Sequence, residues 1–350
     1  MRKTCHAGIV VLLMALGLSL AAGQAMAQPW AAWKTMAPAP DGEEEVFGAV
    51  AGGKVYLMGG IKPLWKPIGI VAEYDPAANK WTAKKPMPEL KHHVGIAALG
   101  GKIYLMGGFV YPAKGEPAWV PVATAWEYTP ATDGWKKLAS MPKPVGALAC
   151  AGLNGKVYCS GGVRLPAWSK RSGLRPGAEI EQPNDLLEYD PASNKWTQKS
   201  PMPSPRNHHV MLAVGGKLYA IGGRIGGPYV SGWSTPMSAN EEYDPAADHW
   251  IPRSPMPSPR SAFGAVVVND RVHVLGGEEW RQYSSTVHRT HEVYDPKANR
   301  WTASIPLATP RHGFLAAAVG NRLYAISGAN VSGGSGPHIG LKVNEMLEVK

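Results

Sequence analysis

The chain has 350 residues and a formal net charge of +10, and 18% of its residues are charged. No polybasic run stands out, so nucleic acid is not an expected partner, and no CxxC, HExxH, Ser-His-Asp or phosphate-loop pattern indicates a familiar catalytic class. The positive charge favours an acidic partner, such as an anionic polysaccharide, an acidic sugar or a membrane surface, or it serves solubility alone.

Residues 1–27 have the features of a secretory signal peptide. Arg2-Lys3 precedes an apolar run over residues 9–22, and Ala25-Met26-Ala27 forms an A-x-A cleavage pattern. An uncleaved anchor is the alternative, because the apolar run is long. Cleavage would leave 34 basic and 26 acidic residues, a net charge of +8, in residues 28–350. We expect an exported monomer, periplasmic or secreted, with no integral membrane segment after cleavage.

Two unlike markers repeat through the rest of the chain at successive intervals of 48, 54, 61, 54 and 51 residues. The first is a tryptophan, at Trp33, Trp81, Trp135, Trp196, Trp250 and Trp301. The second is a glycine-ended pair, at Gly59-Gly60, Gly107-Gly108, Gly161-Gly162, Gly222-Gly223, Gly276-Gly277 and Ser327-Gly328. A shared variable spacing indicates an internal repeat of about 50 residues.

Each repeat is predicted to contain four short strands, a to d. Strand a leads through a two-residue turn to strand b, which ends in the glycines; a long loop then leads to strand c, an Asp-Pro or Thr-Pro turn and strand d. The a–b turns, such as Asn154-Gly155, consist of residues that tolerate the positive φ of a tight hairpin. The strands c end at a tyrosine seven residues before the tryptophan: Tyr74, Tyr128, Tyr189, Tyr243 and Tyr294.

Repeats of about 50 residues with a twin-glycine motif resemble the kelch family, whose repeats form the blades of a β-propeller. The resemblance covers nearly all of the chain after residue 30 and implies an all-β, six-bladed propeller. The blades are expected at about 46–84, 93–138, 146–199, 208–253, 262–304 and 312–349, the last completed by 32–36.

The predicted ring closes with strands from both ends of the sequence. The pattern of residues 33–36 predicts a strand d that has no strands a to c before it. The pattern of residues 345–349 predicts a strand c that has no strand d after it. We expect the N-terminal strand to complete the sixth blade and so remove exposed sheet edges. An open solenoid, or a seventh blade from a partner, is the alternative.

A disulfide is predicted between Cys150 and Cys159. The Asn154-Gly155 turn places them opposite each other on strands a and b of the third blade, on a non-hydrogen-bonded rung where the Cα atoms approach to about 4.5 Å. An oxidising compartment would favour the bond. Two buried free thiols are the alternative.

The b–c and d–a connections emerge on one face of the predicted propeller, where the b–c loops are long and unlike one another. These loops carry the surplus aromatic residues Trp65, Tyr111, Trp119, Trp168, Tyr229, Trp233, Trp280 and Tyr283. They also carry the cations Lys62, Lys66, Lys114, Arg164, Lys170, Arg171, Arg175, Arg224, Arg281 and Arg289. Aromatic rings among cations suit an acidic sugar; alternatively, the aromatic residues form small cores that hold the loops together.

The d–a connections contain histidines and arginines just before strand a. The kelch resemblance implies that Arg206, Arg260 and Arg311 line a pocket. From their place in the chain, we expect His92 and His208 in the d–a connections, and Arg224 and Trp280 in the loops, to bind the ligand too. Alternatively, each arginine pairs with backbone carbonyl groups between blades. His92, His208 and His312 could meet around a metal ion, but we expect neither a metal nor a cofactor.

Catalysis is the alternative to a binding role. Exported six-bladed kelch proteins that interconvert the anomers of N-acetylneuraminate have a catalytic Glu directly after the glycine that ends a strand b, and an Arg a few residues later. Gly276-Gly277-Glu278-Glu279-Trp280-Arg281 is similar. The resemblance implies that Glu278 would transfer a proton and Arg281 would bind the sugar carboxylate. Arg281 is closer to the Glu than in that group, and a surface Glu-Glu pair is the alternative.

Copper chemistry of the galactose-oxidase type needs a cysteine-linked tyrosine, and here the two cysteines are placed to bond each other. We therefore expect a binding module for an acidic glycan or a protein partner, acting through the long-loop face. A sialic-acid epimerase or mutarotase is the alternative.

Overall fold

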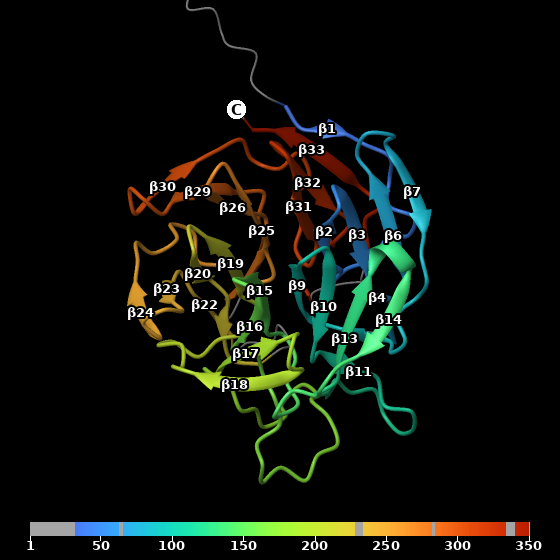
Figure 1. Cartoon of the computed structure of the whole chain (residues 1–350), viewed down its shortest axis with the longest axis vertical. Helices are drawn as coiled ribbons and strands as arrows, with labels where there is room; N and C mark the ends of the chain where they lie inside the picture. Colours follow the sequence, from blue (N-terminus) through green and yellow to red (C-terminus); the bar gives the residue numbers. More distant parts are fainter. Residues whose placement is uncertain (1–31, 63–65, 228–233, 282–283, 334–339, 350) are drawn as a thin grey trace, which may run out of the picture. The chain divides into compact units, whose positions relative to one another are not determined.

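Six four-stranded antiparallel sheets account for most of the part of the protein that the computed structural model describes, namely residues 32–62, 66–227, 234–281, 284–333 and 340–349. We number these sheets as blades 1 to 6 in chain order, each with strands in the spatial order a, b, c, d. Figure 1 shows them arranged around a common centre. The prediction of an all-β propeller is confirmed.

The strand bounds of the first three blades are as follows. Blade 1 consists of β2 (Phe47–Ala51), β3 (Lys54–Met58), β6 (Val71–Asp75) and β7 (Lys80–Ala83). Blade 2 consists of β9 (Gly95–Leu99), β10 (Lys102–Met106), β13 (Ala125–Thr129) and β14 (Gly134–Lys137), with a 3₁₀ turn at Pro130–Thr132. Blade 3 consists of β15 (Ala149–Leu153), β16 (Lys156–Ser160), β17 (Leu186–Asp190) and β18 (Lys195–Lys199).

The other three blades repeat the pattern. Blade 4 consists of β19 (Val210–Val214), β20 (Lys217–Ile221), β23 (Asn240–Asp244) and β24 (His249–Pro252). Blade 5 consists of β25 (Gly264–Val268), β26 (Arg271–Leu275), β29 (His291–Asp295) and β30 (Arg300–Ala303). Blade 6 consists of β31 (Leu315–Val319), β32 (Arg322–Ile326), β33 (Asn344–Glu348) and β1 (Lys34–Thr35).

The six innermost strands form a closed ring. Strands β2, β9, β15, β19, β25 and β31 contact one another in that order, and β31 returns to β2. Strand β1 pairs antiparallel with β33, Lys34 opposite Met346, so the N-terminal strand supplies strand d of blade 6 as predicted. Within the described ranges, no helix is long and apolar enough to cross a membrane.

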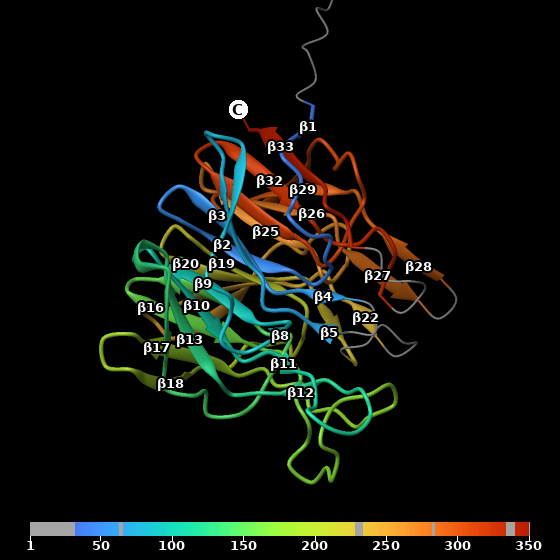
Figure 2. The same ribbon diagram turned by 90° about the vertical axis from the view of Figure 1, so that its right-hand side faces the viewer.

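Short extra strands lie in the connections. They are β4 (Ile61–Lys62), β5 (Lys66–Pro67), β8 (Lys91–His92), β11 (Phe109–Val110), β12 (Val120–Pro121), β21 (Arg224–Ile225), β22 (Thr235–Pro236), β27 (Glu278–Arg281) and β28 (Ser284–Val287). Figure 2 shows β4, β5, β22, β27 and β28 on one side of the ring. These hairpins build up the face that carries the long b–c loops.

The repeated tyrosine and tryptophan join each blade to the one before it. In blade 1, Tyr74 is fully buried and packs on Trp81 with ring centroids 4.9 Å apart. The indole N–H of Trp81 donates to the carbonyl oxygen of Ala37 at 3.0 Å, while Asn79 Oδ1 accepts from Tyr74 Oη at 2.7 Å and from the Ala37 amide at 2.8 Å. Blades 2 to 5 repeat this arrangement, which explains why the two aromatic residues keep their spacing.

The twin glycines allow close approach between neighbouring blades. Gly107 has φ +62°, and a Cβ atom there would lie 2.4 Å from the carbonyl oxygen of Val145. The amide of Gly108 donates to that same oxygen at 2.9 Å. A larger residue would therefore break a main-chain link between blades 2 and 3.

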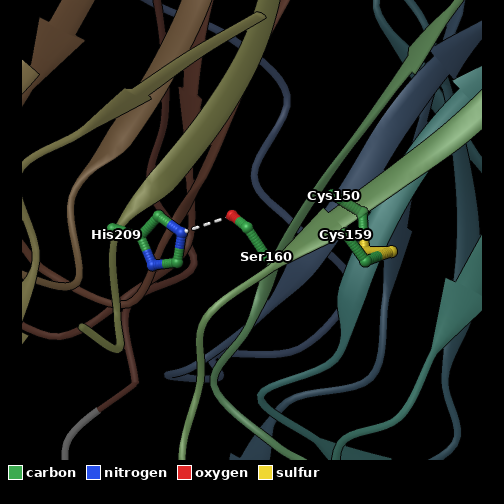
Figure 3. Close-up of a disulfide and its surroundings, with 4 residues drawn as sticks. All are labelled: Cys150, Cys159, Ser160 and His209. Atoms are coloured by element: carbon green, nitrogen blue, oxygen red, sulfur yellow. Dashed lines mark hydrogen bonds between the residues drawn. A yellow bond between two sulfur atoms is a disulfide. The ribbon is translucent and has the colours of Figure 1, made fainter. Parts of the chain in front are cut away.

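Cys150 and Cys159 form the predicted disulfide. They oppose each other on β15 and β16, with Cα atoms 4.1 Å apart, so the alternative of two free thiols is wrong. The next residue, Ser160, is 3.0 Å from His209 Nε2 in the connection to blade 4 (Figure 3). One side of β16 thus carries the disulfide, and a hydrogen bond from its end links blades 3 and 4.

Candidate functional site

One residue in each d–a connection has a left-handed backbone, at the same position before strand a. These residues, with φ of 51°, 52°, 55°, 52°, 50° and 56°, are Glu45, His93, Ala147, His208, Ala262 and Gly313. Main-chain hydrogen bonds link them around the ring: Ala147 to His93, His208 to Ala147, Ala262 to His208 and Gly313 to Ala262, at 2.9 to 3.1 Å. The ring holds an unfavourable backbone conformation in place, and its side chains are presented in a fixed arrangement.

All six left-handed residues line a central cavity of about 480 Å³. The six innermost strands form its walls, which consist mainly of Gly, Ala, Val and Leu. The charged or titratable side chains of the lining are Glu45, His93, His208 and His209, and all belong to the d–a connections. The cavity is thus an apolar channel with one polar end, on the long-loop face.

Glu278 lies at this polar end. It directly follows the twin glycine of blade 5, is 2% exposed, and pairs through its backbone with Ser261 in the adjoining d–a connection. Its Oε1 atom accepts from Arg224 Nη1 at 2.7 Å. Its Oε2 atom accepts from Ser332 Oγ at 2.8 Å and from the Gly333 amide at 2.9 Å. The carboxylate is therefore held in a fixed position.

His312 lies between two carboxylates. Its Nδ1 atom is 3.6 Å from Glu278 Oε2 and 3.6 Å from Glu45 Oε1, and its Nε2 atom donates to the Val331 carbonyl oxygen at 2.7 Å. Burial lowers the pKa of His312, but attraction to Glu278 and Glu45 outweighs it and raises the pKa to about 10. His312 is thus an imidazolium at neutral pH, and the charges of Arg224, Glu278, His312 and Glu45 alternate.

Two buried histidines complete the cluster. His93 Nε2 is 3.3 Å from Glu45 Oε2, and His208 Nε2 accepts from Arg224 Nη2 at 3.1 Å. The two imidazole rings meet edge to face, with centroids 4.8 Å apart. Burial lowers the pKa of both rings. Burial raises the pKa of the Glu45 carboxyl, but attraction to His93, His312 and Arg224 outweighs it and lowers this pKa to about 2.

Family comparisons agree with this architecture. Residues 173–328 match the KLHDC2/KLHL20/DRC7 Kelch-repeats domain and residues 91–142 match the Kelch motif. The chain belongs to the kelch-repeat family. Kelch repeats generally mediate protein binding.

The chain matches only part of the length of its kelch relatives among characterised proteins. Human Kelch-like protein 34 is 31% identical over 170 residues, 48% of this chain and 24% of the relative. Alpha-scruin from Limulus polyphemus is 29% identical over 209 residues, 59% of this chain and 21% of the relative. The chain thus matches about a quarter of each relative's length. The solved structure of YjhT superimposes with a TM-score of 0.71 and 20% identity, over 91% of this chain and 98% of that one, and so shares the fold.

The three arginines predicted to line a kelch pocket lie inside the blades. Arg206, Arg260 and Arg311 are 0% exposed. Each forms an ion pair with a glutamate on strand c of its own blade: Arg206 with Glu241, Arg260 with Glu292 at 2.8 Å, and Arg311 with Glu345 at 2.6 Å. Backbone carbonyl groups accept further hydrogen bonds from Arg260 and Arg311. Ligand binding by these residues stays a prediction, and their burial does not favour it.

Only some of the ligand-binding and catalytic residues predicted from the sequence lie close together in the structure. Arg224, His208 and Glu278 meet at the polar end of the channel, whereas His92 packs behind His93 against Phe109 and Trp119. Trp280 is half-buried on β27, and the side chain of Arg281 lies outside the described residues. Glu278 is not half of a surface Glu-Glu pair, so that alternative is wrong.

Glu45 is a site residue that the sequence prediction missed. Glu45 stands at the same distance before strand a as His93 and His208, and an alignment of the six d–a connections would have revealed it.

Many aromatic and basic residues of the long loops pack or form ion pairs within the chain. Trp119 is 5% exposed and packs in a small apolar core with Phe109, Val163 and Leu174. Arg164 pairs with Glu181 and with Asp185, Arg171 with Glu179, and Arg175 donates to the carbonyl oxygens of Glu116 and Pro117. Trp168, by contrast, is 70% exposed. Trp65, Tyr229, Trp233 and Tyr283 lie outside the described residues.

Proposed function

We propose that this kelch protein is an exported binding module that takes a protein partner through its long-loop face. The observation that carries the proposal is Trp168, a large apolar side chain that is 70% exposed between two anchored points of one loop. At one anchor, Arg164 forms its two ion pairs; at the other, Leu174 exchanges backbone hydrogen bonds with Trp119 at 2.8 and 2.9 Å. Exposed tryptophans on a rigid base are typical centres of protein interfaces.

An acidic glycan is the less favoured ligand of this face. Bidentate recognition of a sugar carboxylate needs available guanidinium groups, and in these loops Arg164, Arg171 and Arg175 are engaged within the chain. The polar end of the channel is balanced, because each cation there faces a carboxylate.

Trp168→Ala is expected to weaken binding of the partner at least about 30-fold, because a central interface tryptophan contributes about 2 kcal/mol or more. The partner would be cross-linked in cells that express the protein, identified by mass spectrometry, and titrated calorimetrically. Ile251→Ala, which alters a 42% exposed residue on β24, is the matched control and should bind as the wild type does. Equal affinity of both variants would contradict the role of Trp168. Binding of acidic sugars in saturation-transfer NMR would instead favour the glycan.

Export is part of the proposal and rests on the features of residues 1–27. Cell fractionation with N-terminal sequencing is expected to find a mature chain beginning near Gln28 outside the cytoplasm. A cytoplasmic chain that retains Met1 would contradict it.

Mutarotation of an acidic sugar such as sialic acid is a second candidate function. It is favoured by the position of Glu278, buried at the polar end of the channel beside Arg224 and His312. If the protein catalyses exchange between anomers in saturation-transfer NMR, Glu278→Gln is expected to slow it at least about 100-fold, whereas the neighbouring variant Glu279→Gln should not. No exchange with the wild-type protein, or full activity in Glu278→Gln, would contradict this candidate.

A further inference from the structure

The polar end of the channel contains a set of metal-ligand side chains. Glu45, His93 and His208 come from three different blades, at the same left-handed position before strand a. One candidate ligand atom from each residue lies within 4.8 Å of the other two. We propose that these residues bind a divalent transition-metal ion at the end of the channel.

The donor types fit such an ion. Two imidazole nitrogens and one carboxylate oxygen are a common donor set for Zn²⁺ and Fe²⁺, and sites of this composition leave one or more coordination positions open. Ligand atoms about 2.1 Å from a tetrahedral ion lie about 3.4 Å apart. His93 Nε2 and Glu45 Oε2, at 3.3 Å, already have this spacing, and small side-chain rotations would bring in His208.

The surroundings orient both imidazole rings. The Nδ1 atom of His208 is 2.5 Å from Asn207 Oδ1, and the Nδ1 atom of His93 is 2.5 Å from His92 Nδ1. In each case the residue immediately before the histidine engages Nδ1, so Nε2 faces the cluster. Hydrogen bonding of the second ring nitrogen is the usual support of a metal-bound histidine.

Arg224 now donates to His208 Nε2, at 3.1 Å. The lone pair of this nitrogen is therefore directed into the cluster, where a metal ion would replace the guanidinium N–H. Arg224 would keep its bonds to Glu278 and Ser261, at 2.7 and 3.1 Å. Because the guanidinium of Arg224 remains nearby, we expect its positive charge to weaken metal binding relative to a site without it.

The test is a calorimetric titration of the mature chain, residues 28–350, with Zn²⁺ alone after treatment with a chelator. We expect one ion per chain, and at least about 100-fold weaker binding after the double substitution His93→Ala and His208→Ala. His249→Ala is the matched control, because His249 is an exposed histidine of blade 4, and its affinity should not change.

Two further measurements separate loss of the site from loss of the fold. Far-UV circular dichroism and thermal melting establish that each variant is folded, and Glu45→Gln and His208→Asn alter single ligands conservatively; each should weaken binding at least about ten-fold. Co²⁺, titrated in place of Zn²⁺, should give the visible absorption of a low-symmetry site. Absence of bound metal, or equal binding by the wild type and the folded double variant, would overturn the proposal. Because the probe is the metal alone, neither outcome depends on the proposed protein partner.

Discussion

Glu241→Leu is expected to lower the free energy of unfolding by about 3–5 kcal/mol, because it leaves the buried guanidinium of Arg206 without its carboxylate. Arg206 is 0% exposed and Glu241 is 4% exposed, and the guanidinium donates directly to the carboxylate. Glu241 also accepts from Ser204 Oγ at 2.6 Å. Removal of the acid therefore leaves a charge and a hydroxyl group without their partner inside blade 4.

Adding Arg206→Val to Glu241→Leu is expected to recover most of the lost stability. Blade 3 has Val145 and Leu187 at the corresponding positions, and both belong to one apolar cluster. Replacement of a buried ion pair by apolar residues is often neutral or stabilising. Blade 3 thus shows that apolar residues can occupy these two positions in this fold.

Urea unfolding of the wild type, the single variant and the double variant measures both effects. A small change in the single variant would mean that water or another group compensates Arg206. A double variant as unstable as the single one would mean that the ion pair, and not merely burial, specifies the packing of blade 4.

The fold could be predicted because its main contacts repeat. The indole of Trp81 bonds to the preceding blade, and Tyr74 packs on that indole and bonds to Asn79. Such an arrangement works only at one spacing, so the sequence preserves the interval between its parts while loop lengths vary. The disulfide could be predicted for a similar reason, since the Asn154-Gly155 turn sets the register of its two strands.

The site was less predictable because neighbouring polar residues in one connection point in different directions. Arg206 and His208 both precede strand a of blade 4, yet Arg206 lies inside the blade and His208 lines the channel. The left-handed backbone at His208 makes this difference, and residue type alone does not indicate it. Arg164 illustrates a second reason: its partner Glu181 is more than ten residues away and pairs with it only after the loop has folded.

The protein is expected to lose stability as the pH falls from about 6.5 to 4, and the buried pair His273–His291 in blade 5 contributes to this loss. His273 Nδ1 is 2.9 Å from His291 Nε2, and the two residues are 4% and 1% exposed. Burial, with Arg271 nearby, lowers the pKa of His273 to about 4; burial, with His273 nearby, lowers that of His291 to about 4. Between these values and the unfolded value of 6.5, the unfolded chain binds more protons than the folded one, so acid favours unfolding.

The other blades indicate how to remove this sensitivity. Strands b of blades 1 and 4 have a tyrosine where blade 5 has His273, and Tyr219 Oη donates at 2.6 Å to Glu242, which opposes it on strand c. Val293 is the residue opposite His273. The double variant His273→Tyr and Val293→Glu would reproduce the pair found in blade 4.

Urea unfolding at pH 7.5 and at pH 5.0 compares this variant with the wild type. Each of the two histidines should cost the wild type roughly 2 kcal/mol over this pH interval. The variant lacks His273, and His291 no longer has a neighbouring imidazole. The decrease in its free energy of unfolding between the two pH values should therefore be smaller by roughly 2 kcal/mol or more. The other buried histidines are unchanged and contribute equally to both proteins, so the difference isolates blade 5. Equal losses in the two proteins would show that the pair does not determine the acid response.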